Sequence, residues 1–226
     1  MIKIIRVGRE RLREAYEIVN KVDQGMNVPE WFVAEPYEEF DFWMKKERGL
    51  LYLAVDEEGK AGAMFFVILP GAHPDNLGYD LGMEEEKLKL CAMMDTAAVL
   101  PEFRGHYLQY KMMQHAEGDL RQIGYRYLLC TVHPENVFSR SNVMKQGYQK
   151  MLTKEKYGGF LRDIWMKNII HRTAQGEKEF CLTNTNKLIR SYEGCVGLKT
   201  GSTSVAKYCV SAVAQRGEMT LLAVVM

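Results

Sequence analysis

Several features that this sequence lacks exclude whole classes of protein. Thirty basic and 29 acidic residues leave a net charge of +1, so the chain has no electrostatic signature of a nucleic-acid or membrane-surface protein. The five cysteines form no C-x-x-C pair, which argues against structural zinc and indicates free thiols in a reducing compartment. The first 20 residues are rich in charged side chains, unlike a signal peptide or a membrane span. We therefore expect a cytoplasmic chain with no nucleic-acid, membrane or metal partner.

The apolar residues that are present follow the periods of strands and helices. At 47% hydrophobic residues over 226 positions, the chain can fill one sizeable core. Alternating or continuous apolar runs predict strands over residues 2–7, 50–55, 61–69, 91–100 and 127–132, and a strand pair within 149–167. Helical spacing predicts helices over residues 9–22, 105–123 and 135–146, with another at the end of 25–43. The predicted order is β-α-α-β-β-β-α-β-α-β-β, with a polar insertion at 70–89.

The periodicity fades after this first region. Residues 171–180 are polar and contain a glycine, so we interpret them as a linker between a domain at 1–170 and a segment at 181–226. In that segment, residues 196–199, 208–214 and 220–225 are β-prone, and Arg216-Gly217-Glu218 is a hairpin turn signal. About 50 residues are too few to bury a core alone.

The end of the predicted strand at 91–100 has the pattern of an anion site. It leads through Pro101-Glu102-Phe103-Arg104-Gly105-His106 directly into a predicted helix. A tight turn of this kind places unpaired backbone N–H groups at a helix N-terminus, where they can bind a phosphate.

This turn and the order of elements resemble the Gcn5-related N-acetyltransferase (GNAT) family. The resemblance rests on Val99-Leu100-Pro101-Glu102-Phe103-Arg104-Gly105, on Thr131-Val132-His133-Pro134-Glu135-Asn136 with Ser139 and Asn142, and on Gly147-Tyr148. It covers residues 1–170 and implies an α/β (α+β) fold with a mixed, mostly antiparallel central sheet flanked by helices. It also implies acetyl-CoA as co-substrate. The implied cofactor-binding residues are Val99, Leu100, Arg104, Gly105, His106, Tyr107, Leu108, Gln109, Asn136, Ser139 and Asn142.

Two positions depart from the family pattern, in which an Arg/Gln-x-x-Gly-x-Gly/Ala turn wraps the pyrophosphate. Tyr107 and Gln109 stand where the family has its two small residues. A tyrosine is tolerated at 107 if its backbone is already helical, although its β-carbon would crowd a phosphate. The side chain of Gln109 could instead donate an N–H to the phosphate.

Acetylation of an amine also needs a base, because a lysine-like amine with a pKa of ~10.4 must lose a proton. Asp95 is the best-placed carboxylate, on the strand that leads to the turn, with Glu102 and His106 behind it. The alternative is that Asp95 caps a neighbour or faces water.

The resemblance adds further expectations about the chemistry. The family's tyrosine acid corresponds to Val143 here, so we assign no acid, and Tyr107 or Tyr148 are alternatives. A backbone N–H near Val99 or Leu100 would polarise the carbonyl group. The aromatic and acidic stretch 25–43 corresponds to the family's acceptor pocket and suits a cationic amine, or else its aromatic residues belong to the core.

The C-terminal segment resembles a different family, the serine D-alanyl-D-alanine carboxypeptidases, over residues 176–226. The matching stretches are 183–190, 194–203 with Lys199-Thr200-Gly201, and 206–209. In that family the lysine and threonine hold the substrate carboxylate, and a Ser-x-x-Lys nucleophile lies far upstream. Here Ser204 and Lys207 form the one Ser-x-x-Lys pattern, three residues after Gly201. We therefore expect an inactive fragment fused to the domain, the least stable part of the chain, whose strand edges favour aggregation or a homodimer.

Three functions remain open at this point. The first is an N-acetyltransferase that moves acetyl from acetyl-CoA to a small-molecule or peptide amine by direct attack. The second is an acyl-CoA-binding module without turnover. The third is a penicillin-binding protein related to the carboxypeptidases.

The third function has a direct test. Covalent capture of a β-lactam needs an activated serine, and Lys199-Thr200-Gly201 can only position a substrate for one. We expect no adduct when the full chain is incubated with a fluorescent penicillin and separated on a denaturing gel. An adduct that disappears in Ser204→Ala would contradict this interpretation of the segment.

Overall fold

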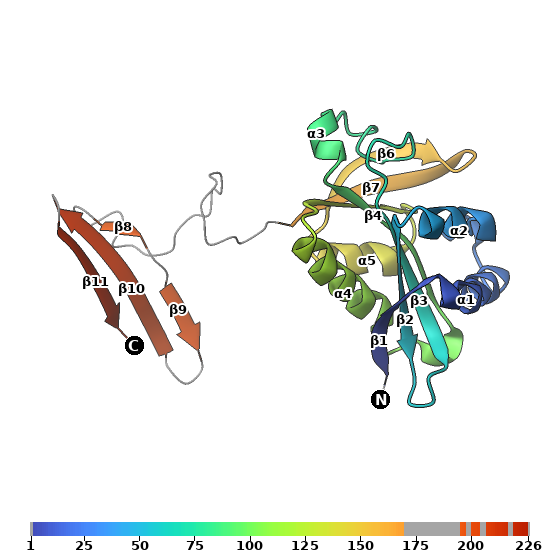
Figure 1. The fold of residues 1–226 in the computed structure, drawn as a ribbon, viewed down its shortest axis with the longest axis horizontal. Helices are drawn as coiled ribbons and strands as arrows, with labels where there is room; N and C mark the ends of the chain where they lie inside the picture. Colours follow the sequence, from blue (N-terminus) through green and yellow to red (C-terminus); the bar gives the residue numbers. More distant parts are fainter. Residues whose placement is uncertain (1, 170–194, 198–199, 204–206, 217–218, 226) are drawn as a thin grey trace. The chain divides into compact units, whose positions relative to one another are not determined.

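A computed structural model describes residues 2–169, 195–197, 200–203, 207–216 and 219–225 (Figure 1). The chain forms two compact units, Met1–Arg172 and Thr173–Met226. The predicted linker at 171–180 lies outside the described residues. No helix in the described ranges is long and apolar enough to cross a membrane.

The first unit contains a seven-stranded sheet in the order β1-β2-β3-β4-β5-β7-β6. Every neighbouring pair is antiparallel except β4 and β5, which are parallel. The predicted order of elements is confirmed, and the insertion adds the short helix α3. The elements are β1 Lys3–Val7, α1 Leu12–Gln24, α2 Tyr37–Lys45, β2 Gly49–Val55, β3 Ala61–Ile68, α3 Glu85–Leu88, β4 Cys91–Val99, α4 Leu108–Gln122, β5 Tyr127–Val132, α5 Val137–Lys145, β6 Gln149–Lys156 and β7 Phe160–Asn168, with 3₁₀ turns at Arg9–Arg11, Pro29–Trp31 and Pro101–Phe103.

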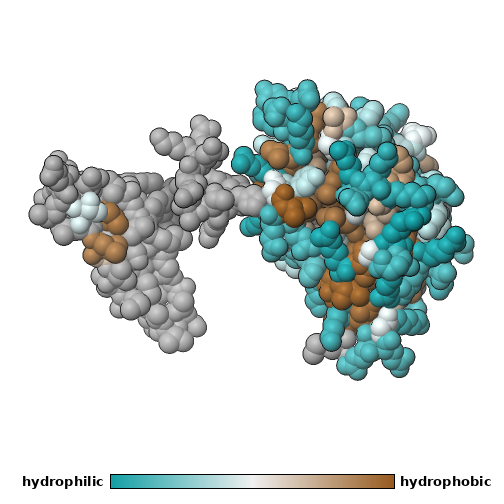
Figure 2. Space-filling model, viewed as in Figure 1, coloured by the Kyte–Doolittle hydropathy of each residue, from teal (hydrophilic) through white to brown (hydrophobic). Residues whose placement is uncertain are grey.

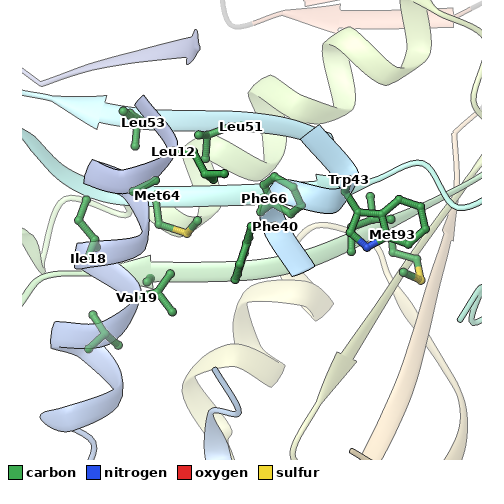
Figure 3. Packing of buried hydrophobic residues seen from close by; sticks show 14 of the residues in the cluster. Leu12, Ile18, Val19, Phe40, Trp43, Leu51, Leu53, Met64, Phe66 and Met93 are labelled. Carbon is green, nitrogen blue, oxygen red and sulfur yellow. The ribbon is translucent and has the colours of Figure 1, made fainter. Parts of the chain in front are cut away.

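The central strands bury both of their faces, which is why β2 and β3 are continuous apolar runs. On β2, Leu51 and Leu53 face the core formed with α1 and α2, whereas Leu50 and Tyr52 face the core formed with α4. Figure 1 shows these helices on opposite sides of the sheet, and Figure 3 shows the first core at close range. At about 0.8 kcal/mol for each buried CH₂ group, the two cores hold the helices on the sheet. The visible outer surface of the unit is mostly hydrophilic (Figure 2).

The sheet opens at its centre, between β4 and β5. Their pairing stops after Met93 and Leu129, although both strands continue beyond this point. On the other side of β4, Val67 pairs with Met94 and Phe66 pairs with Thr96, so Asp95 is an extra residue in a β-bulge. A bulge bends its strand and increases the local twist, which helps β4 diverge from β5.

The helix predicted at 105–123 begins later than expected. It starts at Leu108, because Gly105 and Tyr107 have positive φ angles of 84° and 57°. These two residues turn the chain from the 3₁₀ helix at Pro101–Phe103 into α4. Tyr107 therefore does not have the right-handed helical conformation that would accommodate a tyrosine easily, and it occupies a backbone conformation typical of glycine.

The second unit is an antiparallel sheet around β10 (Lys207–Arg216). The strand β11 (Met219–Val225) pairs with it to form the predicted hairpin, and β8 (Cys195–Gly197) and β9 (Thr200–Thr203) pair with its other edge. Thr200 and Gly201 of the predicted Lys-Thr-Gly element lie on β9. Lys199, Ser204, and Gly217 and Glu218 of the predicted turn lie outside the described residues.

Candidate active site

A groove occupies the gap between the diverging strands. It encloses a cavity of about 90 Å³ lined by Ala97 of β4, Thr131 of β5, Gln109 of α4 and residues of α5. Trp31 and Phe32, from the segment before α2, also line the cavity. The groove exists because β4 and β5 stop pairing where α4 and α5 begin to cover them.

Three of the predicted cofactor-binding side chains line this groove, namely Gln109, Asn136 and Ser139. Asn136 also caps α5, because its side-chain oxygen accepts a hydrogen bond from the Ser139 N–H at 3.0 Å. Asn142 is not among the lining residues. It instead donates to the Met113 sulfur at 3.6 Å and accepts a hydrogen bond from Gln146 at 3.1 Å, so its contacts are structural.

The predicted anion turn lies at the N-terminus of α4. Arg104, Gly105, His106 and Tyr107 are exposed, and Leu108 is buried in the core beneath them. Within the part of the chain that the structure describes, the backbone N–H groups of residues 105–110 have no hydrogen-bond partner. The first turn of α4 contains no acidic residue. The positive end of the helix dipole is therefore open to an anion.

The backbone N–H groups of Val99 and Leu100, which were predicted to polarise a carbonyl group, differ in their availability. The Leu100 N–H is not available, because it donates to the Gly62 carbonyl oxygen at 2.9 Å, which corrects that expectation. In an antiparallel ladder, alternate residues turn their N–H groups to opposite sides. Since Leu100 bonds toward β3, the N–H groups of Val99 and Ala97 turn away from β3, toward the groove.

Asp95 lies where the groove meets a second, larger cavity, because its side chain lines both. The Thr96 hydroxyl donates a hydrogen bond to it at 2.8 Å. Burial raises the pKa of Asp95 to about 6, and the nearby Glu35 and Glu39 also raise it, while the Thr96 hydrogen bond opposes them. Glu102 and His106, which were expected behind Asp95, are exposed.

The larger cavity, of about 400 Å³, lies between α2, the sheet and the β6–β7 turn. Its apolar wall includes Phe40, Trp43, Phe66 and Met93, which also belong to the core (Figure 3). Phe40 and Trp43 of the stretch 25–43 thus belong to the core and also line this cavity. The acidic lining residues are Glu35, Glu39, Asp75 and Asp95. Burial raises the pKa of Glu35, and the charges of Glu39 and Asp75 raise it further.

Tyr157 is a site residue that the sequence did not identify. It lies in the β6–β7 turn with a φ of 52°, and its hydroxyl oxygen is 3.1 Å from Thr131 Oγ1. It lines the larger cavity together with Asp95, and burial, followed by the Asp95 charge, raises its pKa. The sequence predicted a strand pair within 149–167, but no local pattern connects the turn of this pair to a carboxylate on β4.

The other candidate hydroxyl groups lie elsewhere. Tyr107 is 77% exposed, and Tyr148 is buried with a hydroxyl group that has no partner among the described residues. Val143, at the position of the family's acid, is buried and lines the groove.

The fold of the first unit is that of N-acetyltransferases. The ribosomal-protein-S18-alanine N-acetyltransferase from Escherichia coli aligns with a TM-score of 0.58 at 17% identity, over 80% of this chain and 99% of that one. A structure of the NatC complex bound to Gag peptide and CoA aligns with a TM-score of 0.57 at 12% identity, over 75% and 99%. At these identities the similarity establishes the fold, as the resemblance to the Gcn5-related family predicted.

The C-terminal part is similar in sequence to another group. A family model described as D-alanyl-D-alanine carboxypeptidase matches residues 148–226, so the match also includes β6 and β7 of the first unit. D-alanyl-D-alanine carboxypeptidase DacF of Bacillus subtilis (strain 168) is 53% identical over 83 residues, which are 37% of this chain and 20% of that protein. The chain spans a fifth or less of the curated relatives that it matches. The predicted resemblance of this segment is confirmed.

The left-handed conformation of Tyr107 leads to a prediction about stability. The left-handed backbone conformation costs a non-glycine residue roughly 1 kcal/mol, and the exposed ring of Tyr107 contributes little packing. Tyr107→Gly should therefore leave the free energy of unfolding unchanged or raise it by up to about 1 kcal/mol. Tyr110→Gly, inside the first turn of α4, is the control and should lower it by about 1 kcal/mol. If urea denaturation showed an equal loss of unfolding free energy in both variants, this would contradict the left-handed conformation of Tyr107.

Proposed function

We propose that the first unit is an N-acetyltransferase that transfers the acetyl group of acetyl-CoA directly to an amine. The observation that carries this proposal is the continuity of the site. The groove is lined by Gln109, in the first turn of α4, and by Asp95, which also lines the acidic cavity. An anion-binding end, a narrow passage and an acidic pocket are what acetyl-CoA and a cationic amine require.

Different residues of this chain would bind different parts of acetyl-CoA. The free N–H groups of residues 105–110 suit the pyrophosphate, and Gln109, at the start of α4, could add a side-chain donor. The groove past Ala97 and Thr131 suits the pantetheine arm. This arrangement would bring the thioester to the N–H groups of Val99 and Ala97, which would stabilise negative charge on its oxygen during attack.

Asp95 is the proposed general base. An amine enters the cavity as an ammonium ion and must lose a proton before its nitrogen can attack the acetyl carbon. A pKa near 6 leaves the Asp95 carboxylate ionised at pH 7, yet makes it roughly a hundredfold more basic than an ordinary aspartate. The amine nitrogen then attacks the acetyl carbon, so the C–N bond forms and the C–S bond breaks. The second proton that the nitrogen loses balances the proton that the leaving CoA thiolate takes up.

A second candidate function is acyl-CoA binding without turnover, and Val143 favours it. This residue puts an apolar side chain on α5 where the resembled family often has an acid. A thiolate with a cysteine-like pKa of ~8.5 leaves without an acid at a moderate rate. The hydroxyl group of Tyr157 lies near Thr131 and could supply the proton instead. Release of free CoA from acetyl-CoA in the presence of an amine separates the two functions.

We further propose that the C-terminal unit is a carboxypeptidase-derived fragment without activity, joined to the acetyltransferase unit by a fusion. Its sheet carries Thr200 and Gly201, but the sequence has no Ser-x-x-Lys pair upstream of them. Exposed strand edges make self-association through this unit an expected behaviour. A cytoplasmic location is part of the same proposal, and the free thiols Cys91 and Cys130 support it.

The placement of the pyrophosphate predicts the effect of a change at Gly105. Its φ of 84° excludes a β-branched residue, so Gly105→Val should reorient the free N–H groups. We expect acetyl-CoA binding, measured by calorimetry, to weaken about tenfold or more, the loss of roughly 1.4 kcal/mol. Gly118→Ala, inside α4 with open space around it, is the matched control and should bind normally. Unchanged affinity in Gly105→Val would remove the pyrophosphate from this turn.

The proposed base predicts a pH dependence. The rate of the wild-type chain should rise as the pH increases through about 6, where Asp95 ionises. Asp95→Asn should abolish this rise and lower kcat by about 10² to 10⁴, with little change in acetyl-CoA affinity. Asp23→Asn, at an exposed position on α1, is the control. A wild-type pH profile in Asp95→Asn would exclude Asp95 as the base.

The raised pKa of Asp95 also predicts how Asp95→Asn changes the stability of the fold as the pH varies. The pKa of Asp95 is higher in the folded state than in the unfolded state, so folding favours its protonated form. The folded state loses stability as the pH rises from about 4 to about 6. Asp95→Asn should thus be more stable than the wild type above pH 6, and this advantage should shrink toward pH 4, as measured by thermal unfolding at several pH values.

A further inference from the structure

We propose that the acceptor is a small amine with a second positive charge, a diamine or polyamine, whose two cationic groups both lie in the 400 Å³ cavity. This inference rests on the proposed function, because it assigns the amine to the cavity that adjoins Asp95.

The first argument is the unbalanced charge of the cavity. Four carboxylates line it, and Glu35 and Asp95 form no ion pair with any residue that the structure describes. Lys156 also lines the cavity, and its ammonium nitrogen lies 2.7 Å from Asp80 Oδ2. Lys154 lies 2.6 Å from the same carboxylate, so Asp80 and the two lysines together add one net positive charge against four carboxylates. One substrate ammonium would leave much of this negative charge without a partner.

The nearby arginine offsets only part of this negative charge. Arg162 lines a smaller adjoining cavity together with Asp95 and Glu35. Its guanidinium group donates to the carbonyl oxygens of Leu161 and Glu30 at 2.9 and 2.8 Å and stacks against the ring of Tyr157. These contacts hold the Arg162 side chain in the wall of the smaller cavity.

The second argument is the distribution of the carboxylates along the cavity. Asp95 lines both the cavity and the groove, whereas Glu35, Glu39 and Asp75 line the cavity but not the groove. Glu35 and Glu39 lie close enough to Asp95 to raise its pKa, and the Asp75 side chain is 62% exposed. Three carboxylates of the cavity are thus separate from the groove that Asp95 shares. An amine held at Asp95 for acetylation leaves Glu35, Glu39 and Asp75 for a second ammonium group.

The third argument is the apolar wall between these groups. Phe40, Trp43, Phe66 and Met93 face the cavity and are almost completely buried from solvent. Such a wall suits a chain of methylene groups, which gains by leaving water. It offers few donors for the carbonyl groups of a peptide. A carboxylate on the acceptor would be repelled by the same four acidic residues.

Three acceptors of nearly equal length test the proposal: 1,5-diaminopentane, 1-aminopentane and 5-aminopentanoate. The full chain is assayed for CoA release with each, and calorimetry in the presence of CoA measures their binding independently of turnover. The diamine should exceed the monoamine about tenfold or more in kcat/KM and in affinity, because a second charged contact adds that much. The aminopentanoate should be the poorest of the three.

A pair of variants assigns the preference to the cavity. Glu35→Gln should reduce the ratio of diamine to monoamine kcat/KM about tenfold. Glu38→Gln, on the exposed side of α2, is the matched control and should retain the full preference.

The outcomes separate this inference from the proposed function. Equal use and equal binding of the diamine and the monoamine, or a preference for the aminopentanoate, would overturn the acceptor class while leaving acetyl transfer intact. An equal loss with all three acceptors in Glu35→Gln would also overturn it. No acetyl-CoA binding and no CoA release with any amine would overturn the proposed function, and the binding measurement would still decide whether the cavity prefers a diamine.

Discussion

The candidate site depends on one constraint in the backbone, the loss of pairing between β4 and β5 after Met93 and Leu129. Beyond this point, β4 is bonded to β3 alone, so alternate N–H groups on its other side face the groove without a strand partner. A buried donor without a partner costs about 1–3 kcal/mol, so a strand is left in this state only where a ligand or water can bind. The bulge at Asp95 bends β4 at the same place. The position that opens the sheet therefore also carries the proposed base.

The electrostatics of the site follow from the packing around this opening. The cores on the two faces of the sheet hold α2 against β3 and α4 against β4, so the cavity and the groove have fixed walls. Asp95 is partly removed from water by these walls and faces Glu35 and Glu39, which is why its pKa rises. An ordinary exposed aspartate would be a weaker base. The same enclosure that raises its pKa destabilises the ionised form, so function and stability are in opposition at this residue.

The sequence predicted the parts of the fold that depend on local periodicity and missed those that depend on register. The continuous apolar runs of β2 and β3 and the helical spacing in α1 and α4 were enough to predict the order of elements. The bulge at Asp95 was not predictable, because it is defined by which β3 residue lies opposite. Tyr157 was missed for the same reason, since its place beside Thr131 follows from the pairing of β5, β7 and β6. The left-handed Tyr107 was hidden because a tyrosine gives no sequence signal for a positive φ, as glycine would.

The two units also show that sequence identity and a complete site are separate properties. The C-terminal part of the chain is similar to a carboxypeptidase at 53% identity over 83 residues, but these residues correspond to only 20% of that protein. The first unit has the fold of the N-acetyltransferase structures at 12–17% identity, and it contains an anion turn, a groove, a carboxylate with a raised pKa and an acidic cavity. A reaction needs all of its groups within reach of one another, whatever fraction of the sequence they represent. For this reason we place the proposed chemistry at the diverging strands of the first unit, where these groups lie.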